Sequence, residues 1–503
     1  MPTRHGQWCP FELVYGQQLL SECCMRAAIE GLNIQYPRTS DSHDSDSNPK
    51  AKYIYSPVHR RVDAPSLGRR FDNLKIYSAQ SVVGAMLINV NLLPMQLEAA
   101  PRPPIEEVTV DRDPLGHPCP RQFRDKVLVD VIHDGSSLPS VFRLDQRGVS
   151  ILGDEPFPPG FVRERDWGAE LVANRLASAL GLDSYHRVNL ARVLMDFGRF
   201  PGITSAGADH LHRYAINYPF SDRLNHEQKR SVLTEHYDRI SDGLESAMEG
   251  KLLKIAIHTY DKRNPTKFER PAVSLLTRPY GYQALVENPF PHFDPSFPSR
   301  VIEYTADRLL KARIAQTLEE SAIHTADNFP YSLPEGSVEV RAQVWYFYKN
   351  VQSIFERAVG PSTATAINGR CPRKLVWTML LDTNLRSAES QSLRSYLHMF
   401  RTAPTGKKAL FAAAQREYEQ ITDFIQREYD YLVSSYREGP QRPSTILVEV
   451  RKDLVWEFDD GRPIGPRLDN ATYIARKLAL GISQYLSQDR IFKERSSVNK
   501  GFL

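Results

Sequence analysis

Residues 126–133 read KVLVDVIH, a run of β-branched and apolar residues that is typical of a strand buried on both faces. The run ends at an Asp-Gly dipeptide, which marks a turn. Two later runs have the same character, LKIAIH at 253–258 and TILVEV at 445–450, and a shorter strand is expected at 192–196. These segments predict a sheet at the centre of the fold.

Apolar residues recur at helical spacing in two segments that alternate with these strands. Segment 166–180 has this pattern and is followed by Gly181, a residue suited to ending a helix. Segment 469–486 predicts a closing helix with one apolar face. Strands that alternate with helices predict an α/β fold, in which helices flank a mostly parallel or mixed central sheet.

Composition changes along the chain predict its domain organisation. Residues 1–120 form an N-terminal extension, in which the polar, acidic stretch around 38–50 is expected to be disordered and the proline-rich 101–120 to be a linker or arm. Residues 346–439 are rich in helical patterns and lack strand patterns, so they are expected to be a large helical insertion. The α/β domain then consists of 121–345 and 440–495.

The composition excludes several classes of function. The 503 residues include 64 Lys+Arg and 60 Asp+Glu, a net charge of +4, and no dense basic run predicts nucleic-acid binding. No stretch reaches the roughly 20 apolar residues that span a bilayer, so no membrane association is expected. The 5 cysteines are scattered without a Cys-x-x-Cys pair, which favours a reducing compartment and predicts a cytoplasmic protein.

Two histidines stand where predicted strands end, and both are candidate metal ligands. His133 and His258 are the last residues of their strands, and the carboxyl ends of parallel strands meet at the sheet edge where ligands bind. Asp166, which begins a predicted helix, is the candidate third ligand. Three nitrogen or carboxylate ligands with one open position are typical of catalytic zinc, although such ligands also accept other divalent ions.

Other interpretations of these residues are open. A histidine at a strand end is often a hydrogen-bonded turn residue, and Asp166 stands where an N-cap aspartate would stand. His210 and His212, in the sequence HLHRY, form a rival pair with the same-face spacing of a strand, or they lie in a surface loop.

Glu449 lies inside an apolar strand, where a carboxylate is costly unless it is paired or functional. Arg451, two positions on, shares its face and is one candidate for neutralising it. The other interpretation is a general base that takes a proton from metal-bound water.

Two arginines flank Asp196 in the segment ARVLMDFGR, namely Arg192 and Arg199. They are expected either to form a salt-bridge network with this aspartate or to bind a substrate carboxylate, for which the guanidinium fork is suited.

Six segments, in order, resemble the N-formylglutamate amidohydrolase family, whose phosphorylase/hydrolase-like fold is similar to that of zinc carboxypeptidases and aspartoacylase. They are VIHDGSSLP at 131–139, RDWGAELVANRL at 165–176, ARVLMDFGR at 191–199, IAIHTYDKRNPTKFERPAVSLL at 255–276, DNFPYSLPEGSVEVR at 327–341 and ILVEVRKDLV at 446–455.

The resemblance implies a role for each group of candidate residues. It implies one zinc ion per chain, held by His133, Asp166 and His258, with Glu449 as the general base. It implies that two arginines polarise the scissile carbonyl or hold a substrate carboxylate, namely Arg192 and Arg199. The segment at 327–341 resembles the family's Asn-x-Pro-Tyr substrate loop, which implies substrate contacts by Asn328, Tyr331 and Arg341.

This chain departs from the family pattern at residues that surround the substrate. Gly198 stands where the family has Asn, Ala191 where it has Ser, and Ser241 where it often has His. The expected activity is therefore hydrolysis of an N-formyl, N-acyl or peptide-like amide bond in a small carboxylate-bearing molecule or peptide end other than N-formylglutamate.

The alternative is a binding or scaffold protein that keeps the hydrolase core. The N-terminal extension and the helical insertion would then be surfaces for a protein partner or for self-association.

Overall fold

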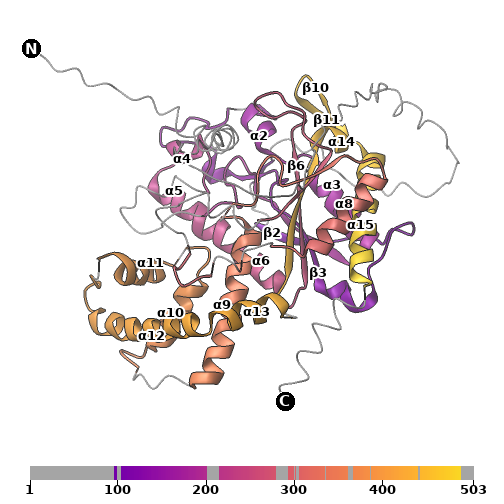
Figure 1. The fold of residues 1–503 in the computed structure, drawn as a ribbon. Helices are drawn as coiled ribbons and strands as arrows, with labels where there is room; N and C mark the ends of the chain where they lie inside the picture. Colours follow the sequence, from indigo (N-terminus) through magenta and orange to yellow (C-terminus); the bar gives the residue numbers. More distant parts are fainter. Residues whose placement is uncertain are drawn as a thin grey trace, which may run out of the picture. The chain divides into compact units, whose positions relative to one another are not determined.

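The centre of the fold is a seven-stranded mixed sheet (Figure 1). The computed structural model describes residues 96–98, 103–153, 155–200, 215–278, 293–298, 301, 305–334, 336–360, 366–385, 387–400, 402–439 and 442–488. The acidic stretch around 38–50 and the pair His210 and His212 lie outside these residues. The expectations for them therefore stay predictions.

Four neighbouring strands of the sheet run parallel to one another, namely β5, β3, β6 and β9. β2 joins one edge antiparallel to β5, and β7 joins β9 antiparallel and carries β8 in parallel. The predicted α/β class with a mixed sheet is thereby confirmed. In spatial order the strands are β2 (Ile105–Thr109), β5 (Ser184–Val188), β3 (Val127–Val131), β6 (Leu253–Tyr260), β9 (Ser444–Arg451), β7 (Val273–Leu276) and β8 (Thr325–Asp327).

Two expectations about strands are wrong. Residues 192–196 form turns with one isolated bridge between Met195 and Ile216, because this segment carries side chains to the site instead of joining the sheet. The proline-rich 101–120 is more than a linker, since Ile105–Thr109 pairs with β5 along its whole length.

One face of the sheet is apolar and packs on three helices, α3 (Ala169–Leu180), α8 (Arg308–Glu320) and α15 (Leu468–Leu486) (Figure 1). Alternate residues of the strands point to this face, among them Ile255, Ile257 and Val448. Gly181 ends α3 with a φ of 68°, a conformation that glycine adopts without steric cost. The two helices predicted from periodicity are thus confirmed.

The opposite face carries the chain's unusual polar residues, with Lys254, His258 and Glu449 on it. Helix α9 (Val338–Val359) covers this face. The Nζ of Lys254, a fully buried residue, lies 2.8 Å from both Asp130 Oδ1 and Glu339 Oε1, which ties β6 to β3 and to the first turn of α9. This polar face is where the candidate site lies.

The region predicted to be a helical insertion consists of helices joined by turns where the structure describes it. Its long helix α9 begins at Val338, before the expected boundary at 346, because its first turns pack on the sheet. The domain boundaries themselves stay a prediction. The other helices of this region are α10 (Pro372–Leu381), α11 (Ala388–Ser395), the π-helical turn Tyr396–Phe400, α12 (Lys408–Arg427) and α13 (Tyr429–Glu438).

None of the helices in the described residues combines the length and the apolar character of a membrane span.

The remaining elements are short and surround the sheet. These elements are β1 (Gln96–Glu98) paired with β4 (Ser137–Pro139), the 3-10 helices Arg121–Lys126 and Ser140–Phe142, α2 (Pro159–Glu164), α4 (Phe220–Arg223), α5 (His226–Ser231), the π-helical turn Val232–Tyr237, α6 (Asp238–Met248), α14 (Lys452–Val455), and the hairpin of β10 (Trp456–Asp459) and β11 (Arg462–Pro466).

Candidate metal centre

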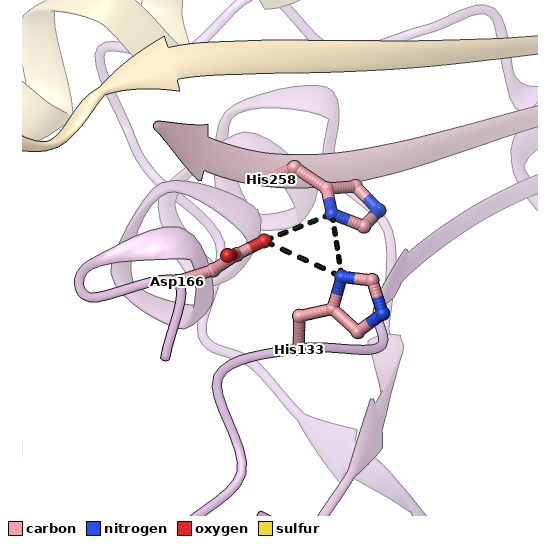
Figure 2. Close-up of side chains that lie close together, drawn as sticks. All are labelled: His133, Asp166 and His258. Carbon is pink, nitrogen blue, oxygen red and sulfur yellow. Dashed lines mark hydrogen bonds and ion pairs between the residues drawn. The ribbon is translucent and has the colours of Figure 1, made fainter. Parts of the chain in front are cut away.

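The three candidate ligands converge at the carboxyl ends of β3 and β6 (Figure 2). His133 lies just beyond β3, which ends at Val131, and His258 lies inside β6, which continues to Tyr260. The expectation that each histidine is the last residue of its strand is therefore wrong, although both reach the same edge. Asp166 lies in the turn before α3 and donates its backbone N–H to the carbonyl of His133 at 3.1 Å.

The donor atoms lie at distances that one cation can bridge. Oδ2 of Asp166 is 2.9 Å from Nδ1 of His258 and 3.6 Å from Nδ1 of His133. The two Nδ1 atoms are 3.1 Å apart. With metal–ligand bonds of about 2.0–2.1 Å, the edge of a zinc tetrahedron is about 3.3 Å. Two ring nitrogens and a carboxylate oxygen at this spacing fit a divalent cation such as Zn²⁺.

The geometry also bears on the interpretations that the sequence left open. All three residues are buried, with exposed fractions of 5% for His133, 2% for Asp166 and 3% for His258. The N-cap residue of α3 is Gly168, so the N-cap role for Asp166 is wrong. Its carboxylate instead faces the two histidines and an arginine.

A fourth residue, Asp196, orients one of the histidines. Its Oδ1 lies 2.9 Å from Nε2 of His133 and accepts that N–H, so the lone pair of Nδ1 points to the centre. A carboxylate behind a metal-binding histidine is the usual partner that fixes its tautomer. The sequence suggested Asp196 only as a partner of arginines. The sequence signal that could have indicated a role at the centre is the position of Asp196 in the ARVLMDFGR segment.

Gly198 leaves the space that this pair needs. Its backbone N–H donates to Asp196 Oδ1 at 2.9 Å. A Cβ at this position would lie 3.1 Å from the same oxygen and 3.5 Å from Cε1 of His133. The glycine at the family's Asn position therefore packs directly against the histidine–aspartate pair.

Two arginines bind the carboxylates of the centre, as the salt-bridge interpretation expects. Arg192 donates from Nη1 to Asp166 Oδ1 at 3.0 Å and from Nη2 to Asp196 Oδ2 at 3.2 Å. Arg199 places its Nε 3.2 Å from Asp196 Oδ2, and its side chain is 53% exposed. A substrate contact by either arginine stays a prediction.

The arginines also set the ionisation of these carboxylates. Burial by itself raises the pKa values of Asp166 and Asp196, but Arg192 and His133 hold both pKa values well below the usual range. Both side chains are therefore ionised near neutral pH, as metal ligation and its support require.

Glu449 lies beside His258, its register partner on the neighbouring strand β9. Its Oε1 accepts a hydrogen bond from the hydroxyl of Tyr331, while its buried Oε2 has no hydrogen-bond partner in the described part of the chain. Burial raises the pKa of Glu449, and the charge of His258 opposes part of that rise. Neutralisation by Arg451 is wrong, since that arginine binds Asp453 at 2.8 Å and Glu269 at 2.6 Å.

The three residues expected in the substrate loop have different surroundings. Tyr331 reaches Glu449 and is 41% exposed, so it lies at the centre. Asn328, with a φ of 49°, accepts the backbone N–H of Thr277 at 2.8 Å. Arg341 is buried and donates to the carbonyl of Phe197 at 3.2 Å, beneath the loop that carries Asp196. The substrate contacts of all three residues stay predictions.

Comparisons with known proteins add a likeness to solved structures only. No protein-family model matches the chain, and no curated protein matches its sequence. The N-formylglutamate amidohydrolase from Ralstonia eutropha JMP134 is 12% identical over 76% of this chain and 98% of that chain, with a TM-score of 0.38. A gene product of Agrobacterium tumefaciens is 14% identical over 74% and 92%, with a TM-score of 0.31. At such TM-scores, the interpretation of the centre rests on its own geometry.

Proposed function

We propose that this protein is a zinc-dependent amidohydrolase that cleaves an N-formyl, N-acyl or peptide-like amide bond of a small carboxylate-bearing substrate. The observation that carries the proposal is the convergence of three buried donor side chains, His133, Asp166 and His258. Beside them lies the carboxylate of Glu449, one oxygen of which has no hydrogen-bond partner within the described segments. The six sequence segments that resemble N-formylglutamate amidohydrolases support the same reaction.

The residues of the centre divide the chemistry among them. When bound, zinc would act as a Lewis acid toward the carbonyl and would lower the pKa of a water molecule. Glu449 Oε2 accepts a proton from the attacking water, because no other donor in the described part of the chain occupies it. The raised pKa of Glu449 lets it hold this proton until the C–N bond breaks and then pass it to the leaving nitrogen. Tyr331 holds the other oxygen in place meanwhile.

The charge of the centre favours an anionic substrate. Three carboxylates lie there, on Asp166, Asp196 and Glu449, and two guanidinium groups balance two of them. A divalent ion would bring the sum to one positive charge. Arg199 is half-exposed and is the guanidinium that a substrate carboxylate would reach most directly, with Arg192 behind it.

The test combines metal analysis with hydrolysis by the purified full chain. Elemental mass spectrometry of the wild type is expected to find about one zinc per chain, and the variant His258→Ala is expected to lose it. Release of free amine or formate is then measured on a panel of N-formyl amino acids, N-acetyl amino acids and dipeptides, each beside its amide-capped analogue without the carboxylate.

The result that supports the proposal is zinc-dependent hydrolysis that falls when the substrate carboxylate is capped. A folded wild type that binds no zinc and hydrolyses no member of the panel would overturn it. That outcome would favour the binding or scaffold function, with the helical region as the surface for a partner.

A further inference from the structure

The residue after His133 and the residue before Asp166 form a buried ion pair. Nε of Arg165 lies 2.7 Å from Oδ1 of Asp134, and the side chains are 7% and 3% exposed. One position on, the backbone N–H of Asp166 donates to the carbonyl of His133 at 3.1 Å. The two loops that carry metal ligands are therefore joined at two successive positions.

Asp134 and Arg165 each have a further contact besides the one that they make with each other. Asp134 accepts the backbone N–H of Glu170 through Oδ2 at 2.8 Å. This N–H is one of the amides at the start of α3, which have no carbonyl partner within the helix. The guanidinium of Arg165 lies 4.2 Å from the ring centre of Trp167, which is fully buried. An ion pair anchored at both ends in this way has one geometry, unlike a pair of mobile surface side chains.

The three candidate ligands differ in how the fold holds them. His258 lies within β6, where ladder pairing to β9 continues on both sides of it. His133 lies beyond the end of β3, and Asp166 lies before the first residue of α3. Two of the three ligands are thus on loops, and hydrogen bonds of a strand or helix do not fix their backbones.

We propose that Asp134 and Arg165 are positioning residues that hold His133 and Asp166 at the spacing that zinc requires, and so set the affinity of the centre for metal. The inference rests on the proposed metal centre. Both oxygens of the Asp134 carboxylate are bound by groups outside the three candidate ligands, Oδ1 by Arg165 and Oδ2 by the backbone N–H of Glu170. The expected consequence is that weakening this pair weakens metal binding more than it weakens the fold.

The chain offers a matched control for the loss of a buried ion pair. Arg373 Nε lies 2.6 Å from Glu417 Oε2, with side chains 8% and 6% exposed, so the distance and burial are close to those of the Asp134–Arg165 pair. The control pair joins α10 to α12 and lies outside the candidate centre. Breaking either pair is expected to lower the stability of the fold, whereas only the loss of the Asp134–Arg165 pair is expected to lower the affinity for metal.

The experiment measures zinc affinity of the full-length, metal-stripped chain by competition with a chromogenic chelator, for the wild type, Asp134→Asn and Glu417→Gln. Asp134→Asn keeps the shape of the side chain and one acceptor oxygen. It is expected to lower zinc affinity by about tenfold or more, in the range seen when groups that orient metal ligands are changed. Glu417→Gln is expected to keep the wild-type affinity, even where its melting temperature falls equally.

Cobalt supplies a second measurement, which would not change if the Asp134–Arg165 pair only stabilised the fold. The visible absorption bands of Co²⁺ bound at the centre report ligand geometry, and they are expected to shift in Asp134→Asn and not in Glu417→Gln. Arg165→Lys is the second variant, for the case that Asp134→Asn does not fold. It keeps the charge but loses the geometry of Nε, so a smaller loss of zinc affinity is expected.

The outcomes separate the inference from the proposed function. A wild type that binds zinc, with folded Asp134→Asn and Arg165→Lys variants that match its affinity and its cobalt spectrum, overturns the positioning role and leaves the hydrolase proposal standing. A folded wild type without zinc affinity overturns both.

Discussion

Glu449 and His258 are direct register partners on the adjacent parallel strands β9 and β6, and their side chains lie on the same face of the sheet. Both are buried, at 3% exposure each, on a face that is otherwise covered by α9. The register of the two strands thus places beside a candidate metal ligand a carboxylate whose Oε2 has no hydrogen-bond partner among the described residues.

The variant Glu449→Gln is expected to fold and to bind zinc like the wild type, because the amide keeps the shape and the acceptor oxygen for Tyr331. It cannot accept a proton, so the rate of amide hydrolysis is expected to fall by about two to four orders of magnitude. Steady-state rates on the best substrate of the panel check this, with zinc content measured on the same samples. Near-normal turnover would contradict the role of Glu449 as the base.

Gly198→Ala is expected to disturb the pair of His133 and Asp196, since the new Cβ would lie 3.1 Å from Asp196 Oδ1. Zinc affinity is expected to fall by about tenfold, the low end for changes behind a metal ligand. Gly465→Ala is the control, because a Cβ at Gly465 would meet no atom of the described part of the chain within 4 Å. Equal zinc affinities for the two variants, by chelator competition, would argue against tight packing at Gly198.

Lys254→Met is expected to destabilise the fold strongly, since it leaves Asp130 and Glu339 buried without their common cation. Removing one partner of a buried ion pair costs about 3–5 kcal/mol. Denaturant unfolding of the metal-stripped chain measures this loss. Adding Asp130→Leu and Glu339→Met to the same variant is expected to recover most of the stability. A single variant within about 1 kcal/mol of the wild type would contradict this assignment, since that cost is too small for an unpaired buried charge.

Asp113→Asn is expected to lower stability in a pH-dependent way. Hydrogen bonds of 2.6 and 2.8 Å from Arg476 hold the pKa of Asp113 below its usual value. Because the folded state lowers this pKa, the pair stabilises the fold above about pH 4, and the gain is lost as the pH falls through the folded-state pKa.

The expected difference in unfolding free energy between the wild type and Asp113→Asn is about 0.5–1 kcal/mol at pH 7, shrinking toward pH 3. Thermal melts across this pH range test it. Asp183→Asn serves as the control, since Asp183 and Arg112 form a pair with side chains 86% and 60% exposed. A difference from the wild type that grows toward acid pH would have the wrong sign.

The sequence predicted the central elements because their signals are local. The runs at 126–133, 253–258 and 445–450 each contain a strand, and the helical spacing at 166–180 and 469–486 corresponds to α3 and α15. The two wrong predictions about strands also come from local signals. Residues 192–196 have strand-like composition but form turns, and the proline-rich composition of 101–120 did not indicate the edge strand that this segment contains.

By itself, the sequence determined which residue types stand near the ends of the buried strands, and so which side chains were candidates for a metal centre. Only the tertiary structure decided that Asp166 faces two histidines instead of capping α3, that Asp196 holds His133, and that Arg451 turns away from Glu449 to bind Asp453. The physical reason is the sequence separation over which each property is set. Periodicity fixes the face on which a side chain lies, whereas the distance between two donor atoms depends on strand order, on register and on how the loops between them close.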